Sequence, residues 1–165
     1  MDHPSIEQRY TESAGRYLED FAVGDVYHHS PGRTVTQYDN AAFTLLTMNT
    51  HPLHFDEEYA ARTEFGKPLV ASPLTVSIVL GMTVSDVSQK AVANLGWKEI
   101  RLPAPVFHGD TLYSSTEVLD KRESKSRSNA GVVYVMTEGV NQHGTVVCSF
   151  ERQMLIAKRP AGSPD

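Results

Sequence analysis

The chain has 165 residues, of which 40% are hydrophobic, and its 15 basic and 20 acidic side chains give a formal net charge of −5. This length and composition predict one globular domain with a buried core, and the negative charge argues against nucleic acid or a membrane as a partner. The first residues lack a basic, apolar leader, and no segment has the approximately 18 consecutive apolar residues of a membrane span. The single cysteine, Cys148, lies in an apolar run and is expected to be a buried thiol, in keeping with a cytoplasmic protein.

The polarity of the two ends predicts the limits of the domain. Residues 1–15 lack apolar periodicity and are expected to form a loose arm, residues 16–158 the domain, and residues 159–165 a disordered tail. Residues 26–29 and 33–35 have the composition of two short strands, with turn chemistry between them at a Pro-Gly pair.

Helix signals occupy the middle of the chain. Thr36 predicts a helix start because its hydroxyl can accept from the N–H of Asp39, and we interpret Asp39 as part of this cap in preference to a catalyst. The helix is expected to end by Thr50, since the proline at position 52 lacks an N–H. Ser72 followed by Pro73 predicts the cap of a second helix, which is expected to be buried on most sides because apolar residues cover more than one of its faces.

The remainder of the chain alternates in strand-like runs over residues 92–102, 111–123, 132–140 and 145–157. Helices followed by a meander of long strands indicate an α+β order. Such a sheet has edges that need cover, and the apolar run at residues 132–135 is interpreted as an edge strand that a second copy of the chain covers. We therefore expect the protein not to be monomeric.

Chemistry is concentrated in residues 47–56, where an apolar segment gives way to an amide, two imidazoles and a carboxylate. Histidine titrates near neutral pH, so His51 and His54 are candidates for proton transfer, although a helix-ending loop with solvent-facing or backbone-bound histidines would look the same. A metal site of His51, His54 and Asp56 is disfavoured, because a proline interrupts the group and no further ligand lies nearby. Asp56 can instead cap a short helix that follows it. His108, before a Gly-Asp pair, is interpreted as a strand-entry residue.

Residues 49–54, Asn-Thr-His-Pro-Leu-His, resemble the Asp-x-Asn-Pro-Leu-His motif of the MaoC-like, R-specific enoyl-CoA hydratases. Residues 65–70 are similar to that family's segment before its central helix, and residues 102–110 to one of its strand entries. The resemblance extends over roughly residues 16–157. It departs from the motif at Asn49, where the family has a catalytic aspartate, and at His51, where it has asparagine.

The resemblance implies a single hot-dog domain, in which a long central helix is wrapped by a curved antiparallel sheet, and a homodimer or higher homo-oligomer with active sites near the interface. It implies hydration or dehydration of an acyl-CoA substrate, with His54 as general base and no metal or other cofactor. Because an amide does not titrate, Asn49 would orient the water while His54 acts as sole base. Alternatively, another carboxylate takes the place of the family's aspartate, or the protein has lost hydration activity. Ser72 matches the family's glycine whose backbone N–H holds the enolate oxygen, and we assign His51 to substrate binding.

Residues 47–50, 94–97 and 103–105 resemble most closely the branch acting on short branched dicarboxylic acyl-CoAs, such as mesaconyl- or itaconyl-CoA. Two alternatives stay open. One is a hot-dog thioesterase, which would need a carboxylate to activate water, and the other is a non-catalytic acyl-CoA-binding module.

Overall fold

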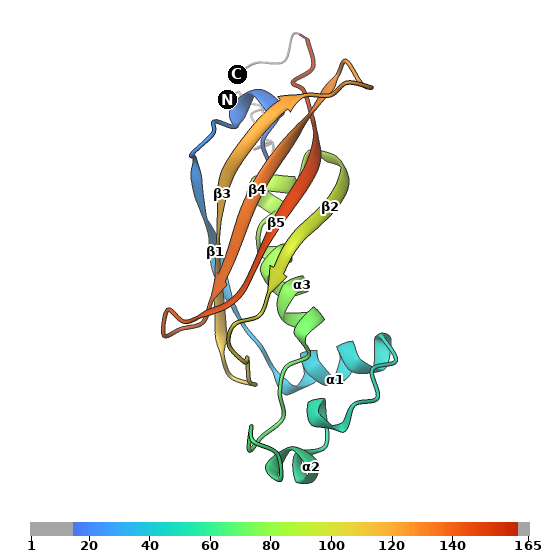
Figure 1. Cartoon of the computed structure of the whole chain (residues 1–165), viewed down its shortest axis with the longest axis vertical. Coiled ribbons are helices and arrows are strands. Elements are labelled where there is room, and N and C mark those ends of the chain that lie inside the picture. Colours follow the sequence, from blue (N-terminus) through green and yellow to red (C-terminus); the bar gives the residue numbers. More distant parts are fainter. Residues whose placement is uncertain (1–14, 162–165) are drawn as a thin grey trace, which may run out of the picture.

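A five-stranded antiparallel sheet curves around one helix in the computed structural model, which describes residues 15–161 (Figure 1). The strands are β1 (Val26–Thr34), β2 (Ala91–Arg101), β3 (Thr111–Glu123), β4 (Ala130–Val140) and β5 (Val146–Ala157), and their order in the sheet is β1-β3-β4-β5-β2. The predicted α+β class is confirmed. Nearly all of the predicted N-terminal arm, and most of the predicted tail, lie outside the described residues.

The helices divide between the concave face of the sheet and one end of it. They are η1 (Leu18–Asp20), α1 (Gln37–Leu46), η2 (Pro52–His54), α2 (Glu57–Ala61), α3 (Ser72–Met82) and the π-helical η3 (Val84–Ser88). Figure 1 shows α3 against the sheet, while α1 and α2 extend beyond it as a separate lobe. Within residues 15–161, no helix has the length and apolar character needed to cross a membrane.

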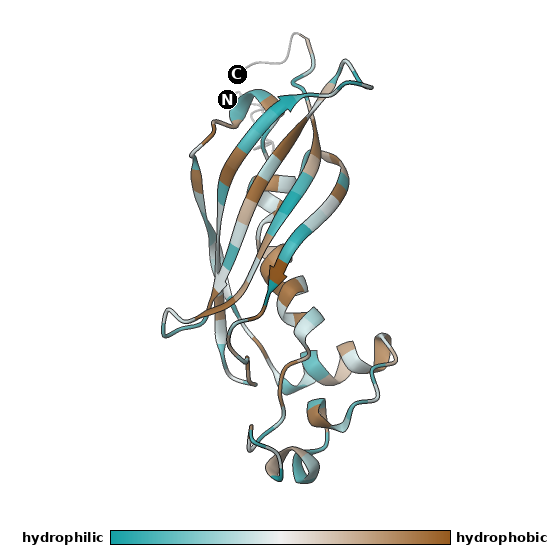
Figure 2. Ribbon diagram, in the orientation of Figure 1, coloured by the Kyte–Doolittle hydropathy of each residue, from teal (hydrophilic) through white to brown (hydrophobic). Residues whose placement is uncertain are grey.

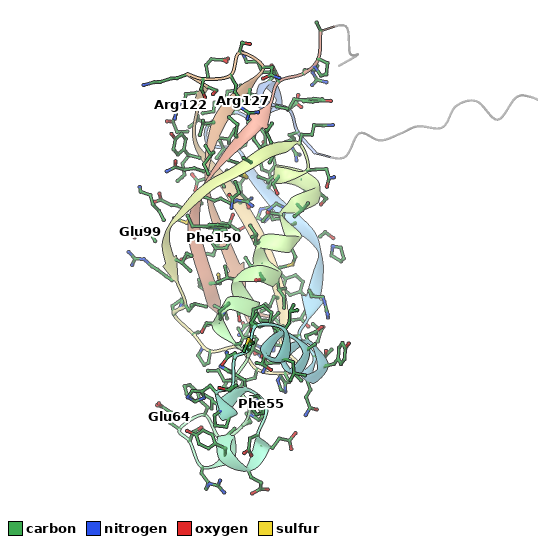
Figure 3. All side chains as sticks on the ribbon, turned by 90° about the vertical axis from the view of Figure 1, so that its right-hand side faces the viewer. Phe55, Glu64, Glu99, Arg122, Arg127 and Phe150 are labelled. Atoms are coloured by element: carbon green, nitrogen blue, oxygen red, sulfur yellow. The ribbon has the colours of Figure 1, made fainter. Side chains whose placement is uncertain are left out.

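The core lies between α3 and the inward side chains of the sheet. Val79 of α3 packs with Leu112 of β3 and Phe150 of β5, and Figure 3 shows Phe150 on the side of the sheet that faces α3. Gly139 on β4 permits the close approach, because a Cβ at this position would lie 2.5 Å from a methyl carbon of Val79. Cys148 belongs to the same cluster and is fully buried, as predicted.

The prediction that residues 132–135 form an edge strand is wrong. β4 is hydrogen-bonded to β3 on one side and to β5 on the other, so residues 132–135 lie in the middle of the sheet. Val132, Val133 and Val135 are all buried, which means that the strand is covered on both faces. A nearly continuous apolar run is typical of such a central strand. The edges of the sheet are β1 and β2.

Two further expectations need correction. The two predicted strands at residues 26–29 and 33–35 form the single strand β1, whose pairing with β3 is irregular between His29 and Arg33. The central helix is not buried on most sides, since Ser72, Ser77 and Gly81 are exposed. The sheet covers one face of α3, and within residues 15–161 no element lies over the opposite face.

The start of α1 agrees with the prediction. The Thr36 hydroxyl accepts a hydrogen bond from the Asp39 N–H at 3.2 Å, and the Asp39 carboxylate accepts one from the Thr36 N–H at 2.8 Å. Arg33 donates to the same carboxylate at 2.7 Å. Burial raises the pKa of Asp39, but the hydrogen bonds from Thr36 and the charge of Arg33 outweigh it and leave the pKa below its usual value.

We expect Asp39→Ala to lower the free energy of unfolding by about 1 kcal/mol at pH 7, because the helix loses its reciprocal cap. A carboxyl whose pKa is lowered on folding stabilises the fold fully above its unfolded pKa, near 3.8, and loses this contribution as the pH falls through the folded value. Urea denaturation of wild type and variant should therefore converge toward acid pH. Glu64→Gln, at an exposed position in the α2 lobe, is the control and should change little.

Candidate active site

The C-terminal end of α1 sets the position of Asn49. Met48 adopts the left-handed conformation, with φ of 56°. The Met48 N–H donates to the Leu45 carbonyl at 3.3 Å, and the Asn49 N–H donates to the Thr44 carbonyl at 2.9 Å. This pair of bonds is a Schellman motif, which usually has glycine at the left-handed position. The helix therefore ends at Leu46 with a strained turn, which leads into residues 49–56, here called the motif loop.

Within the loop, hydrogen bonds fix the side chains of Asn49 and His51. The Asn49 Oδ1 accepts from the His51 N–H at 3.2 Å, and its Nδ2 has no acceptor among residues 15–161, so this donor is available to a ligand. His51 caps the turn η2, and its Nδ1 accepts from the Leu53 N–H at 3.2 Å. In a neutral His51 ring the proton is therefore on Nε2.

His54 holds the opposite tautomer. Its Nδ1 lies 2.8 Å from the carbonyl oxygen of Leu69. A carbonyl can only accept, so Nδ1 carries the hydrogen and Nε2 keeps its lone pair. The centroids of the His51 and His54 rings are 5.8 Å apart. The Nε2 atoms of the two neighbouring imidazoles thus differ in hydrogen-bonding capacity. His54 can accept a proton at Nε2, and a neutral His51 can donate a hydrogen bond from Nε2.

The segment before α3 binds the motif loop on one side and the β2–β3 connection on the other. The Leu69 N–H donates to the Leu53 carbonyl at 3.1 Å, and the Val70 N–H donates to the Val106 carbonyl at 2.9 Å. Because the Leu69 carbonyl also accepts from His54, the His54 ring lies beside the segment that leads into α3. Ser72 is the first residue of α3, three positions after Leu69, so both predicted site residues adjoin the segment that leads into this helix.

Ser72 is not the N-cap of α3, contrary to the prediction. The cap position is Ala71, which has no side-chain oxygen, and Ser72 is the first helical residue. The helix begins one residue earlier than predicted because the Ala71 carbonyl already accepts from the Thr75 N–H at 3.2 Å, and the side chain of Asn40 accepts the Ala71 N–H at 2.9 Å. As the first residue of the helix, Ser72 has an N–H without an intrahelical acceptor at the positive end of the helix dipole.

The sequence reasoning missed Asn40, a fully buried residue of α1. Its Nδ2 lies 2.8 Å from the His54 carbonyl, 3.0 Å from the Leu69 carbonyl and 3.2 Å from His108 Nε2. One signal could have found it. Asparagine is a poor helix former, so an asparagine followed by apolar residues within a predicted helix calls for a buried partner.

His108 is half-buried and lies opposite the same amide. The Asn40 Nδ2 is a donor, so His108 Nε2 acts as the acceptor. Burial lowers the pKa of His108 below its usual value of 6.5, while the charge of Glu57 opposes this shift and that of Lys67 adds to it. The residue is therefore more than the strand-entry residue we predicted, because it packs against the site in its neutral form.

Two hollows near the motif loop are lined by different predicted site residues. Asn49 lines an apolar hollow of about 410 Å³ between α1 and the loop, together with Ala41, Thr44, Leu45, Met48, Thr50 and Phe55. Figure 3 places Phe55 in the α1–α2 lobe, at the opposite end of the molecule from Arg122 and Arg127. Ser72 lines a separate hollow of about 230 Å³ near Pro105 and Val106. In the single chain, Asn49 and Ser72 thus lie in different hollows.

Two carboxylates near the loop have structural partners. Asp56 accepts from the Tyr59 N–H at 2.9 Å and caps α2, as predicted. Asp39 caps α1. Among residues 15–161, no group of three or more His, Cys, Asp or Glu side chains is arranged to hold a metal ion.

A sheet wrapped around α3, with a His-containing loop bound to the start of that helix, defines a MaoC-like hot-dog protein. Residues 3–165 match the family described as mesaconyl-CoA hydratase, and the chain belongs to that family.

Several known proteins are similar to the chain over most of its length. It is 37% identical to a mesaconyl-CoA hydratase of Cereibacter sphaeroides, over 92% of the chain and 44% of the relative. The structure of a putative MaoC domain protein dehydratase from Chloroflexus aurantiacus is 36% identical with a TM-score of 0.84, over 91% of the chain and 42% of that structure. A Mycobacterium tuberculosis protein described as a double hotdog fold is 25% identical with a TM-score of 0.81, over 92% and 47%. The chain spans about half the length of these relatives.

We expect His108 to titrate below pH 6.5 in an NMR titration, because its environment favours the neutral ring. Its contribution to stability is complete above the unfolded pKa near 6.5 and is lost as the pH falls from there toward the lowered folded value. His108→Asn should flatten this part of the stability profile. His143→Asn, at an exposed turn, is the matched control, and an equal effect of both variants would contradict the assignment.

Proposed function

We propose that the protein hydrates a short α,β-unsaturated acyl-CoA thioester and dehydrates the corresponding 3-hydroxyacyl thioester, with mesaconyl-type branched dicarboxylic acyl groups as the first candidates. One observation carries the proposal. The hydrogen bond from His54 Nδ1 to the Leu69 carbonyl, 2.8 Å long, leaves Nε2 as a base at the N-terminal end of α3. Membership of the mesaconyl-CoA hydratase family supports the substrate class.

The reaction balances with one base and one water. His54 Nε2 takes a proton from the water while the water oxygen bonds to the β-carbon, and the electrons of the double bond move to the thioester oxygen as an enolate. The protonated His54 then gives this proton to the α-carbon, and the enolate returns to the thioester. Since one nitrogen handles the proton, hydrogen and hydroxyl add to the same face of the double bond. The reaction needs no cofactor.

The other candidate residues would bind and orient the reactants. The free Nδ2 of Asn49 suits the water oxygen, which leaves a water proton for His54. The N–H of Ser72, which has no acceptor among residues 15–161, and the positive end of α3 suit the enolate oxygen, where negative charge develops. The Nε2–H of a neutral His51 is a further donor for the substrate.

The caps formed by Asp39 and Asp56 favour a hydratase over a thioesterase. A thioesterase needs a carboxylate to activate water toward the carbonyl carbon, and these two carboxylates near the loop already accept backbone N–H groups. Incubation with short enoyl-CoAs tests the choice, if the loss of enoyl absorbance and the release of thiol are followed separately. Thiol release would indicate a thioesterase, and binding without either change would indicate a non-catalytic module.

His54→Ala should lower the hydration rate by about 10²–10⁴, the range for removing a positioned acid–base group. Asn49→Ala should cost less, because it removes an orienting donor and leaves the base in place. Asn49→Asp introduces a second titrating group, so hydration should persist with a changed acid limb of the pH–rate profile. Steady-state kinetics with a short enoyl-CoA measures all three effects, and an unaltered rate in His54→Ala would refute the site.

We also propose that a second copy of the chain packs against β2 and the outer face of α3. β2 is a sheet edge, and its apolar residues Val92, Leu95, Trp97 and Ile100 are all exposed. Between β2 and α3 runs a groove of about 410 Å³, lined by Ser72, Pro73, Val76, Ser77, Leu80, Trp97, Ile100 and Leu102. Figure 2 shows apolar positions on both elements. A long apolar edge of this kind requires cover, and Ser72 places the proposed oxyanion site at the same surface.

Sedimentation should give a dimer mass or higher at micromolar concentration, because this apolar edge is unpaired within residues 15–161. Trp97→Lys introduces a charge into the groove and should shift the protein toward monomer. Leu119→Lys is the control, since Leu119 is exposed on β3, away from the groove, and the oligomer should survive the change. A wild-type monomer would remove the shared interface from the proposal.

A further inference from the structure

We propose that Asn40 is a positioning residue for the reaction, and that its buried amide fixes the base His54 and the start of α3 relative to each other. The inference rests on the proposed function of His54. Asn40 lies on α1, nine positions before the motif loop begins, and its side chain is fully buried. It would contact neither substrate nor water, so its effect is exerted through the residues that it holds.

The first contact controls the tautomer of His54. The Leu69 carbonyl accepts from His54 Nδ1 at 2.8 Å and from Asn40 Nδ2 at 3.0 Å. One oxygen thus receives two donors, one from the base and one from α1. The second donor limits where this oxygen can lie, and the oxygen in turn decides which ring nitrogen of His54 carries the hydrogen.

Two more contacts fix the backbone on either side. Asn40 Nδ2 donates to the carbonyl of His54 itself at 2.8 Å, which ties the residue that carries the base to α1. Asn40 Oδ1 accepts from the Ala71 N–H at 2.9 Å, directly before Ser72. Because a backbone N–H needs an acceptor, this bond also determines which end of the amide is oxygen.

The fourth contact uses His108. Its Nε2 lies 3.2 Å from Asn40 Nδ2. The two N–H groups of this nitrogen have three acceptors nearby, and His108 Nε2 is the most distant of them. A protonated Nε2 would turn a donor toward a donor, so the arrangement requires the neutral ring. The charged groups that act on His108 are Glu57 of α2 and Lys67 of the segment before α3.

The choice of partners distinguishes positioning from simple packing. A purely structural asparagine would satisfy whichever backbone groups lie nearby. The three backbone partners of Asn40 are instead the base residue His54, the acceptor of its ring at Leu69, and the residue before the proposed enolate donor. A buried polar network with every member paired holds one geometry, and small displacements of reacting groups are costly to the rate.

The test compares Asn40→Leu and Asn40→Asp with wild type in the intact protein. Both variants should lower kcat by about 10²-fold, the effect of misplacing a reacting group by roughly 1 Å, with a much smaller change in KM. Nitrogen NMR of the His54 ring should show the Nδ1–H tautomer in wild type and a mixture in Asn40→Leu. Thr137→Val is the control, because it removes a buried hydroxyl that bonds Thr116 at 3.0 Å on the sheet; it should reduce stability but leave kcat and the tautomer unchanged.

Asn40→Asp keeps the shape of the side chain. If Asn40→Leu does not fold, the inference is tested with Asn40→Asp alone. Its carboxylate can accept the Ala71 N–H but can donate only when protonated. The kcat of Asn40→Asp relative to wild type should therefore rise as the pH falls, which a packing role would not produce.

Near wild-type kcat in both variants, with the His54 tautomer unchanged, would overturn the inference. If wild type itself hydrates no enoyl-CoA, the proposed function fails, and the tautomer measurement alone decides the role of Asn40. An unchanged tautomer would then overturn that role, and a mixed one would support it.

Discussion

The Leu69 carbonyl joins the parts of the molecule on which the proposed chemistry depends. It accepts from the ring of His54 and from the buried amide of Asn40, while the Leu69 N–H donates back to Leu53 in the motif loop. These bonds connect α1, the loop and the segment that begins α3. A histidine on an irregular loop would otherwise be free to exchange tautomers, and the carbonyl removes that freedom by offering only an acceptor.

The sheet supports this arrangement from the other side of α3. Gly139 lets the helix approach β4, and Val79, Leu112 and Phe150 fill the space between them. With the helix held against the sheet, its first residue, Ser72, has a defined position at the end of the helix that adjoins the loop. The lobe of α1 and α2 then needs few contacts with the sheet, because hydrogen bonds to the segment before α3 anchor it.

The surface formed by β2 and the exposed face of α3 is largely apolar. β2 presents apolar side chains at a sheet edge, and the exposed face of α3 lies beside it across a groove that includes Ser72. The two hollows lined by Asn49 and by Ser72 are separate in one chain. A second hot-dog unit over this surface would cover the edge and enclose the substrate between the two units, which connects assembly with the proposed reaction.

The sequence by itself determined the α+β order, the limits of the four C-terminal strands to within two residues, the caps at Thr36 and Asp56, and the loop with Asn49, His51 and His54. These features follow from local chemistry: alternation, capping side chains and the missing N–H of Pro52. Only the tertiary structure decided that β4 is central, because an apolar run is compatible with either an edge or a strand covered on both faces. Only it decided the tautomers of the two histidines and the contacts of Asn40, since each depends on a partner 14 to 68 residues away or on a loop geometry that spacing does not fix.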